Sequence, residues 1–162
     1  MGLACDHDHS DSRPGHAEVE QAIVSVEARC AAEGERMTAP RRRVLELLLA
    51  AGEPVKAYDL IARYGLDGQA AKPPTVYRAL EFLERLGFAH RIESLNAYVP
   101  CRIDGQSHRA AFLICDCCGA AEEFEPDFTA QLAAAAKAGY QVSTITLEAR
   151  GRCAACSAPA SS

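Results

Sequence analysis

Residues 73–99 of the 162-residue chain read PPTVYRALEFLERLGFAHRIESLNAYV, and the spacing of the apolar side chains changes within this stretch. Up to Gly87 the apolar residues recur every three or four positions, which is typical of the buried face of a helix. Beyond Gly87 they alternate on both sides of a polar turn at residues 93–96, which is typical of a β-hairpin. The sequence therefore predicts a helix that runs directly into a two-stranded ribbon.

The helical spacing of apolar residues also occurs three times before this stretch. A glycine follows each of the three segments, as is common at helix ends. We expect these helices at about residues 17–33, 39–51 and 55–64. Short helices followed by a two-stranded ribbon form the winged helix-turn-helix pattern. We therefore predict a DNA-binding domain over residues 17–100, with its recognition helix beginning at Pro73.

Polar side chains of the predicted recognition helix are suited to DNA contacts. Thr75 would present a hydroxyl at the helix N-terminus, where phosphate binds well. Tyr77 and Arg78 lie off the apolar stripe, so they should reach phosphates or base edges. Side chains that could hold backbone phosphates on either side are Arg41, Arg42, Lys56 and Tyr58. The alternative is that Tyr77 covers a core and Arg78 pairs with Glu81 or Glu84.

Charge is distributed unevenly along the chain, although the formal net charge is −5. Residues 36–91 carry ten Lys or Arg against six Asp or Glu, whereas residues 1–35 and 92–162 are both acidic. A positive island within the predicted DNA-binding domain favours a polyanionic partner. A solvated helical face would have a similar composition, so charge alone does not decide between the two interpretations.

Two Cys-x-x-Cys pairs stand near the end of the chain, Cys115–Cys118 and Cys153–Cys156. Four thiolates in two tight turns suit one tetrahedral Zn²⁺. A site in which the protein supplies all four ligands leaves no open position for a substrate, so its role would be structural. We therefore predict a zinc ion that clips together the two ends of a folded segment.

The segment enclosed by the cysteine pairs predicts a small α+β unit over residues 108–156. Strands are expected at residues 110–115 and 121–125, a helix at 128–138 and a long strand at 140–149. About 50 residues bury little surface, so zinc and dimerisation would stabilise the unit. The long strand is a candidate edge for pairing with a second copy. The expected fold is a winged helix-turn-helix domain followed by a small α/β dimerisation domain with structural zinc.

A looser set of ligand types lies around the predicted hinge at residues 101–107. The set is one thiol, two imidazoles and one carboxylate, a combination suited to Zn²⁺: His90, Cys101, His108 and Glu123. A metal held there would fix the angle between the two units. Taken singly, His90 could be a half-exposed strand residue and Cys101 a small buried one.

The rest of the sequence places limits on cellular context. Residues 1–16 and 157–162 have the composition of disordered tails, and the acidic N-terminus lacks the basic start of an export signal. We therefore expect a cytoplasmic protein without a membrane span, in which cysteines bind metal or stay free; export would favour disulfides instead. The remaining cysteines and histidines have weaker predicted roles. Loose metal ligands in the tail could be Cys5, His7, His9 and His16. Cys30 is expected in the core, and no role is predicted for Cys117.

Three segments of the sequence resemble the ferric uptake regulator family, and within it the zinc uptake regulators. They are KPPTVYRALEFL, GFAHRIESLNAYVPC and FLICDCCG, and the resemblance extends in order over about residues 17–156. It implies a homodimer that binds a double-stranded DNA operator and represses zinc-uptake genes, not an enzyme acting on a small molecule. It implies two zinc ions per subunit, a structural one at the four cysteines and a regulatory one at the hinge set. It also implies DNA contacts by Tyr58 and Arg78.

The chain departs from the iron-sensing members at the strand before the first cysteine pair. Those members have a His-rich run, whereas this chain has only His108 there. The thiol of Cys101 also favours zinc, because thiolate is a poor ligand for harder ions. An iron, manganese or peroxide sensor of the same family, or a zinc module that does not bind DNA, remains the alternative at this stage.

Overall fold

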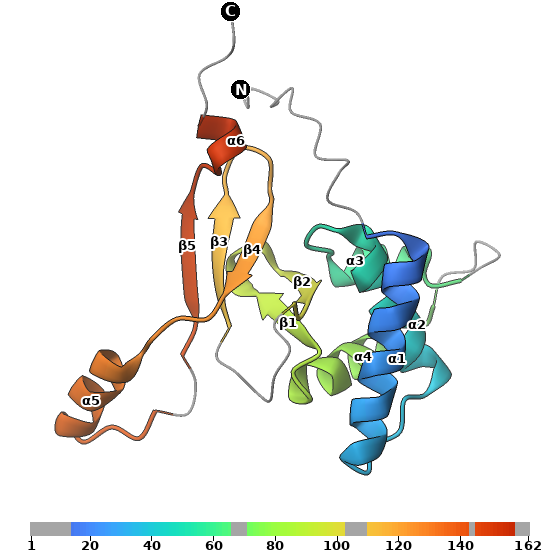
Figure 1. Ribbon diagram of the computed structural model, residues 1–162, viewed down its shortest axis with the longest axis horizontal. Coiled ribbons are helices and arrows are strands. Elements are labelled where there is room, and N and C mark those ends of the chain that lie inside the picture. The colour runs from blue at the N-terminus through green and yellow to red at the C-terminus, as the bar shows by residue number, and fades with distance from the viewer. Residues whose placement is uncertain (1–13, 66–70, 103–109, 143–144, 158–162) are drawn as a thin grey trace, which may run out of the picture.

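A helical half and a sheet half make up the protein in the computed structural model (Figure 1). The structure describes residues 14–65, 71–102, 110–142 and 145–157. The predicted tails at 1–13 and 158–162 and most of the hinge, with His108, lie outside these residues. None of the helices within the described ranges is long and apolar enough to cross a membrane.

Four helices form the first half over the residues that the structure describes, and their ends follow from local sequence. They are α1 (His16–Ala32), α2 (Ala39–Ala51), α3 (Ala57–Arg63) and α4 (Pro73–Arg85). Pro73 and Pro74 occupy the first turn of α4, where a missing N–H costs nothing. Gly52 ends α2 in the left-handed conformation, at φ 68°. The four predicted helices are therefore confirmed to within about two residues.

The predicted hairpin follows α4 directly and forms the wing. It consists of β1 (Ala89–Ile92) and β2 (Ala97–Pro100), joined by the 3₁₀ turn η2 (Glu93–Leu95). Asn96 takes the left-handed conformation at φ 48°, which asparagine tolerates better than most residues. Val55 exchanges two backbone hydrogen bonds with Tyr98, so the segment before α3 also pairs with the wing.

One apolar core holds the helices and the wing together. The fully buried members include Val44, Leu48, Leu60, Leu80 and Leu83, so α2, α3 and α4 all contribute. Burying one such side chain contributes about 1.5–3 kcal/mol. The apolar stripe on α4 that the sequence predicted is therefore what anchors this helix and leaves its opposite face exposed.

The described part of the second half is a three-stranded sheet with two helices. It contains β3 (Ala111–Cys115), β4 (Ala121–Phe124), α5 (Thr129–Lys137), β5 (Leu147–Gly151) and α6 (Ala154–Ser157). The strand order is β4-β3-β5, with β4 antiparallel and β5 parallel to β3. Figure 1 shows the wing between this sheet and the helices. The predicted winged-helix domain followed by a small α/β unit is confirmed.

The predicted long strand at 140–149 is wrong in its first half. Strand β5 begins only at Leu147, and Tyr140 and Val142 are exposed coil. The reason is the length of its partner, because β3 has five residues and pairs from Ala111↔Leu147 to Cys115↔Gly151. The alternation of apolar residues continues towards the N-terminus beyond the length of β3, so the residues before Leu147 have no part of β3 to pair with. Strand β5 does lie at an edge of the sheet, as predicted.

Candidate metal centres and nucleic-acid interface

The four predicted zinc-binding cysteines meet at one end of the sheet. Their sulfur atoms all lie within 4.8 Å of one another. The parallel pairing of β3 with β5 brings Cys115 beside Gly151, two residues before Cys153. Cys118 follows in a turn completed by Gly119 at φ 75°, and Cys156 lies on α6. The topology of the sheet therefore assembles the site from both ends of the segment.

Distances at this cluster agree with a tetrahedral metal. The sulfur atoms of Cys118 and Cys153 are 3.9 Å apart. Two sulfurs of a tetrahedral zinc site with 2.3 Å bonds would be about 3.8 Å apart.

Beside the cluster, the guanidinium of Arg150 donates two hydrogen bonds to one carboxylate oxygen of Asp116, at 2.6 and 2.8 Å. This ion pair joins the first cysteine turn to β5.

Electrostatics at the cluster also favours a cation. Backbone N–H groups of Cys118 and Cys153 lower the pKa of Cys115 to about 6, so this thiol ionises readily. Burial and the neighbouring thiols of Cys153 and Cys118 raise the pKa of Cys156 to about 12. Four adjacent thiolates repel one another unless a positive ion lies between them. A Zn²⁺ ion supplies that charge, and the donor set fits it.

The hinge set converges from both halves of the protein. His90 from β1, Cys101 after β2 and Glu123 from β4 have ligand atoms within 4.8 Å of one another. The His90 Nε2 atom is 3.0 Å from Glu123 Oε1, and the two side chains are 13% and 3% exposed. Cys101 Sγ lies 3.8 Å from the same carboxylate oxygen. Three of the four predicted ligands thus come together, and His108 lies outside the described residues.

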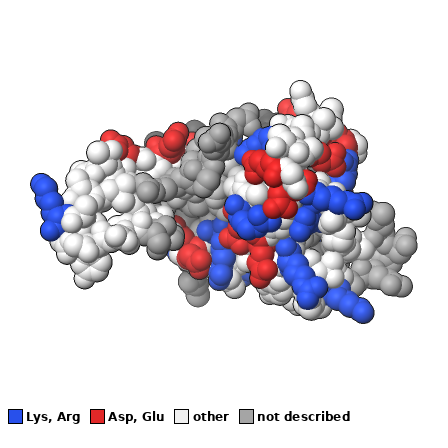
Figure 2. All heavy atoms as spheres, turned by 90° about the horizontal axis from the view of Figure 1, so that it is seen from below, with Lys and Arg blue, Asp and Glu red and all other residues white. Residues whose placement is uncertain are grey.

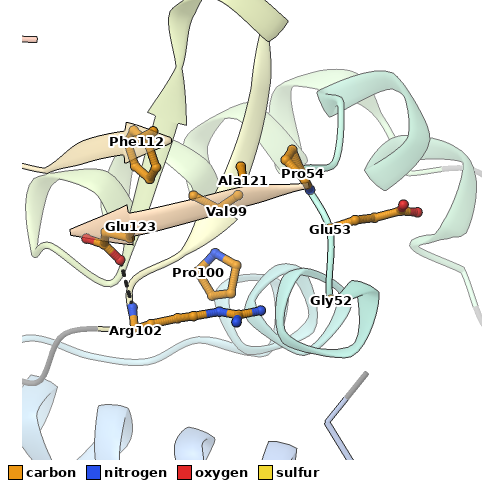
Figure 3. Close-up of a pocket in the computed structure, with 9 residues that line it drawn as sticks. All are labelled: Gly52, Glu53, Pro54, Val99, Pro100, Arg102, Phe112, Ala121 and Glu123. Atoms are coloured by element: carbon orange, nitrogen blue, oxygen red, sulfur yellow. Dashed lines mark hydrogen bonds between the residues drawn. The ribbon is translucent and has the colours of Figure 1, made fainter. Parts of the chain in front are cut away.

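The other oxygen of Glu123 is held by the backbone. Arg102 donates its N–H to Glu123 Oε2 at 2.9 Å, which Figure 3 shows as a dashed line. The pocket in that view is lined by residues from the turn after α2, from β2 and from β3 and β4. Its position identifies the seam between the winged helix and the sheet. Glu123 is therefore oriented at this seam with one oxygen toward His90 and Cys101.

Most of the predicted DNA contacts lie on exposed surface. Tyr58 on α3 is 78% exposed and Tyr77 on α4 is 46% exposed, so neither covers the core. Arg78 and Lys56 are also exposed, while Thr75 in the first turn of α4 is half-buried. Among the ion pairs of the described residues, none joins Arg78 to Glu81 or Glu84. The arrangement leaves these side chains able to meet a ligand.

Arg41 and Arg42, the two arginines of α2 that were predicted to hold phosphates, make more contacts within the protein than the sequence suggested. Arg42 pairs with Glu20, Glu27 and Glu46, so its charge ties α1 to α2 and is not directed at a phosphate. Arg41 lies over the ring of Phe82 at 3.5 Å and donates to the carbonyl of Arg36. Figure 2 shows Lys and Arg concentrated over the helical half on one face, interleaved with Asp and Glu.

Three further residues with sequence predictions lie outside both clusters, two cysteines and one histidine. Cys30 is buried in the helical core, as predicted. Cys117, for which no role was predicted, is not part of either ligand cluster. His16 lies in the first turn of α1 and not in a tail.

Known proteins are similar to this chain over most of its length. A profile of the Ferric uptake regulator family matches residues 32–150. The Zinc uptake regulation protein of Escherichia coli (strain K12) is 39% identical over 140 residues, which cover 85% of this chain and 82% of that protein. A structure of a zinc uptake regulator complexed with zinc and DNA is 39% identical, covers 85% of this chain and 94% of its own, and gives a TM-score of 0.80.

A third relative, XcZur, is known in two forms, and both are 46% identical to this chain. The holo form gives a TM-score of 0.75 over 84% of this chain and 96% of its own. The apo form gives 0.50 over 88% and 99%. The structure as a whole is therefore more similar to the holo form than to the apo form. The chain belongs to the ferric uptake regulator family and, within that family, is similar to zinc uptake regulators.

Proposed function

We propose that the protein is a zinc-responsive, DNA-binding repressor that controls genes of zinc uptake and homeostasis. The observation that carries the proposal is the convergence of His90, Cys101 and Glu123 from the two halves of the molecule. A ligand set that spans a hinge couples metal occupancy to the position of the DNA-binding domain. The similarity to zinc uptake regulators supports the same function.

The two ligand clusters would have different roles, with two zinc ions per subunit. The four cysteines would hold a structural zinc that closes the sheet half. His90, Cys101, Glu123 and His108 would hold the regulatory zinc across the hinge. The thiol of Cys101 supports zinc over iron or manganese, because thiolate is a soft ligand. With His108 as the fourth hinge ligand, neither cluster would keep the open coordination position of a catalytic zinc, which supports a regulator and not an enzyme.

The DNA interface would be the outward face of α3 and α4, with Arg41 contributed by α2. Arg78 would read base edges, since an exposed arginine pairs bidentately with guanine O6 and N7. Side chains proposed to contact the sugar-phosphate backbone or adjoining bases are Arg41, Lys56, Tyr58, Thr75 and Tyr77. In a homodimer, two recognition helices about 34 Å apart would meet successive major grooves.

The proposed division of the chain follows from these roles. Residues 17–100 form the DNA-binding domain, residues 101–107 the hinge and residues 108–156 the dimerisation domain, in a cytoplasmic protein. Bound zinc adds a coordinate link across the hinge. The ligand side chains then hold the two domains at one angle, which raises the population of the DNA-competent form. About 3 kcal/mol of difference per dimer would correspond to roughly 100-fold tighter DNA binding.

The test is operator binding by a hinge variant with and without zinc. Cys101→Ser should lose zinc-dependent binding to DNA upstream of its own gene and of zinc-transporter genes, measured by fluorescence anisotropy. It should keep one zinc per subunit and a folded dimer, because the four-cysteine cluster is intact. The matched control is Cys30→Ala, which removes a thiol from the helical core and should leave zinc-dependent binding in place.

Two outcomes would count against the proposal. If Cys101→Ser still bound the operator only with zinc, the regulatory ligands would be misassigned. If the unmodified protein responded to Fe²⁺ or Mn²⁺ at lower free concentration than to Zn²⁺, it would be another kind of sensor in this family. Titrating the protein with each metal while following anisotropy separates these cases.

A further inference from the structure

A carboxylate of the sheet half makes hydrogen bonds to the wing at a point away from both metal clusters. Glu148 lies on β5, and its Oε1 accepts the backbone N–H of Glu93 at 2.7 Å. Its Oε2 accepts the backbone N–H of Ser94 at 3.1 Å. These N–H groups begin the η2 turn of the wing, where a 3₁₀ turn leaves donors without internal partners. A residue 55 positions along the chain therefore caps the turn of the wing.

Strand register places this contact in line with the hinge ligand. Phe112 on β3 pairs with Glu123 on one side and with Glu148 on the other. Directly opposed residues of neighbouring strands point to the same face of a sheet. The row Glu123–Phe112–Glu148 thus crosses the sheet on one face, with a carboxylate at each end.

The middle of this row is an apolar contact with the wing. Phe112 and Ile114 from β3 share a buried cluster with Ile92 from β1 and Val99 from β2. Such a contact favours docking but fixes no angle, because hydrophobic attraction is not directional. The two carboxylates supply direction, since each accepts a backbone hydrogen bond at a defined position: Glu148 from the turn of the wing, and Glu123 from Arg102 at the start of the hinge.

Glu148 is ionised at this contact. Burial alone would raise its pKa, but hydrogen bonds from Ser94 and Glu93 and the charge of Arg150 hold the pKa below its ordinary value. Hydrogen bonds to a charged acceptor are about twice as strong as neutral ones. The contact also involves backbone donors, so it depends on the position of the wing and not on its side chains.

We propose that Glu148 is a positioning residue, a latch that sets the wing on the sheet independently of the hinge metal. The hinge ligands and this latch hold opposite ends of the same row, so both favour one docked arrangement. The latch makes that arrangement more populated before zinc arrives. The effect on DNA binding rests on the proposed function, whereas the effect on the wing itself does not.

Linkage gives the latch a signature that distinguishes it from general stability. If Glu148 favours the docked form, its loss must weaken zinc at the hinge and DNA at α4, because both bind that form. We expect Glu148→Ala to raise the Kd for hinge zinc and the Kd for operator by about five- to tenfold each. Glu148→Gln keeps one acceptor oxygen and should fall between Ala and the unmodified protein.

The control variant is Glu125→Gln, which neutralises an exposed carboxylate just beyond β4. It should leave both dissociation constants unchanged. Dimerisation and retention of one zinc per subunit after mild chelation should be the same in all variants. If Glu148→Ala failed this check, Glu148→Gln would provide the measurement, since it preserves the size of the side chain.

A readout without metal at the hinge or DNA keeps the latch separate from the proposed function. Amide hydrogen exchange at Glu93 and Ser94 should be faster in Glu148→Ala than in the unmodified protein, with the hinge zinc removed from both. Unchanged exchange would overturn the latch even if zinc-dependent repression were established. Faster exchange in a protein that lacked zinc-dependent DNA binding would uphold the latch and reject the repressor. Weaker operator binding with unchanged hinge-zinc affinity would also overturn it.

Discussion

Single side chains differ sharply in whether the fold uses them or leaves them for a ligand. Arg42 and Arg78 are both arginines in helices of the DNA-binding half. Arg42 is enclosed by three glutamates, whereas Arg78 is exposed on the face of α4 opposite the buried stripe. Removing an exposed cation that forms no ion pair within the described residues should change the free energy of unfolding little. Its removal should therefore affect binding alone.

Replacing Arg78 with alanine should weaken operator binding without changing stability. A bidentate contact to guanine is worth about 1–3 kcal/mol, so the Kd should rise by about 5- to 150-fold. Fluorescence anisotropy in saturating zinc measures the Kd, and thermal unfolding should give an unchanged Tm. Arg85→Ala is the matched control, because Arg85 lies on the same helix but pairs with Glu35. Equal loss in both variants would argue against base reading by Arg78.

At the scale of elements, helix α5 is the clearest sign of an unmet contact. None of its residues is buried, and Figure 1 shows it projecting away from the sheet. A nine-residue helix is only marginally stable in water without tertiary packing. Leu132 and Ala135 share its less exposed side, so a second copy should cover that side in the homodimer.

A charge placed on that side of α5 should disrupt the dimer. Leu132→Arg would bury an unpaired cation at the contact, which is costly in an apolar interface. We expect the dimer dissociation constant, measured by analytical ultracentrifugation, to rise at least tenfold. Gln131→Arg adds the same charge at an exposed neighbouring position and should leave the constant unchanged. A stable Leu132→Arg dimer would mean that α5 lies outside the interface.

How far the sequence predicts these features depends on how local their causes are. The helices and the wing follow from apolar spacing, glycine stops and Asn96, all of which act within a few residues. The spacing of the two Cys-x-x-Cys pairs likewise predicts the four-cysteine metal site. The start of β5 and the contacts of Arg42 and Glu148 cannot be predicted in this way, because each is decided by a partner far along the chain: β3, the α1 glutamates and the η2 turn.

At the scale of the whole molecule, the proposed hinge ligands and the proposed latch at Glu148 would favour one docked arrangement. The similarity to the holo form of XcZur fits this view, since the apo form aligns less well at equal identity. Removing zinc from the hinge should therefore broaden the range of distances between the two halves. The sheet half should stay intact as long as its four cysteines remain ligated.

Small-angle X-ray scattering should detect that broadening. A chelator that empties the hinge but not the four-cysteine cluster should raise the radius of gyration and the maximum dimension of the unmodified dimer. The reason is that only the latch and the apolar contact then oppose separation of the halves. In Cys101→Ser the radius of gyration and the maximum dimension should already be raised, and neither should change on chelation. Identical scattering of the unmodified protein with and without the chelator would contradict a role for the hinge metal in docking.

The parallel pairing of β3 with β5 has a consequence for the order in which the protein acquires its metal. Cys115 and Cys153 become neighbours only after the chain between them has been made and has crossed back over the sheet. Closing that loop costs chain entropy, which a metal bond across its ends offsets. We therefore expect the four-cysteine zinc to enter during folding and to exchange slowly afterwards. In the proposed mechanism the hinge ligands lie at a seam that reopens, so their zinc should equilibrate with the zinc of the cell. The four-cysteine zinc would then be acquired once, when the protein is made. The hinge zinc would follow the zinc supply of the cell at each moment.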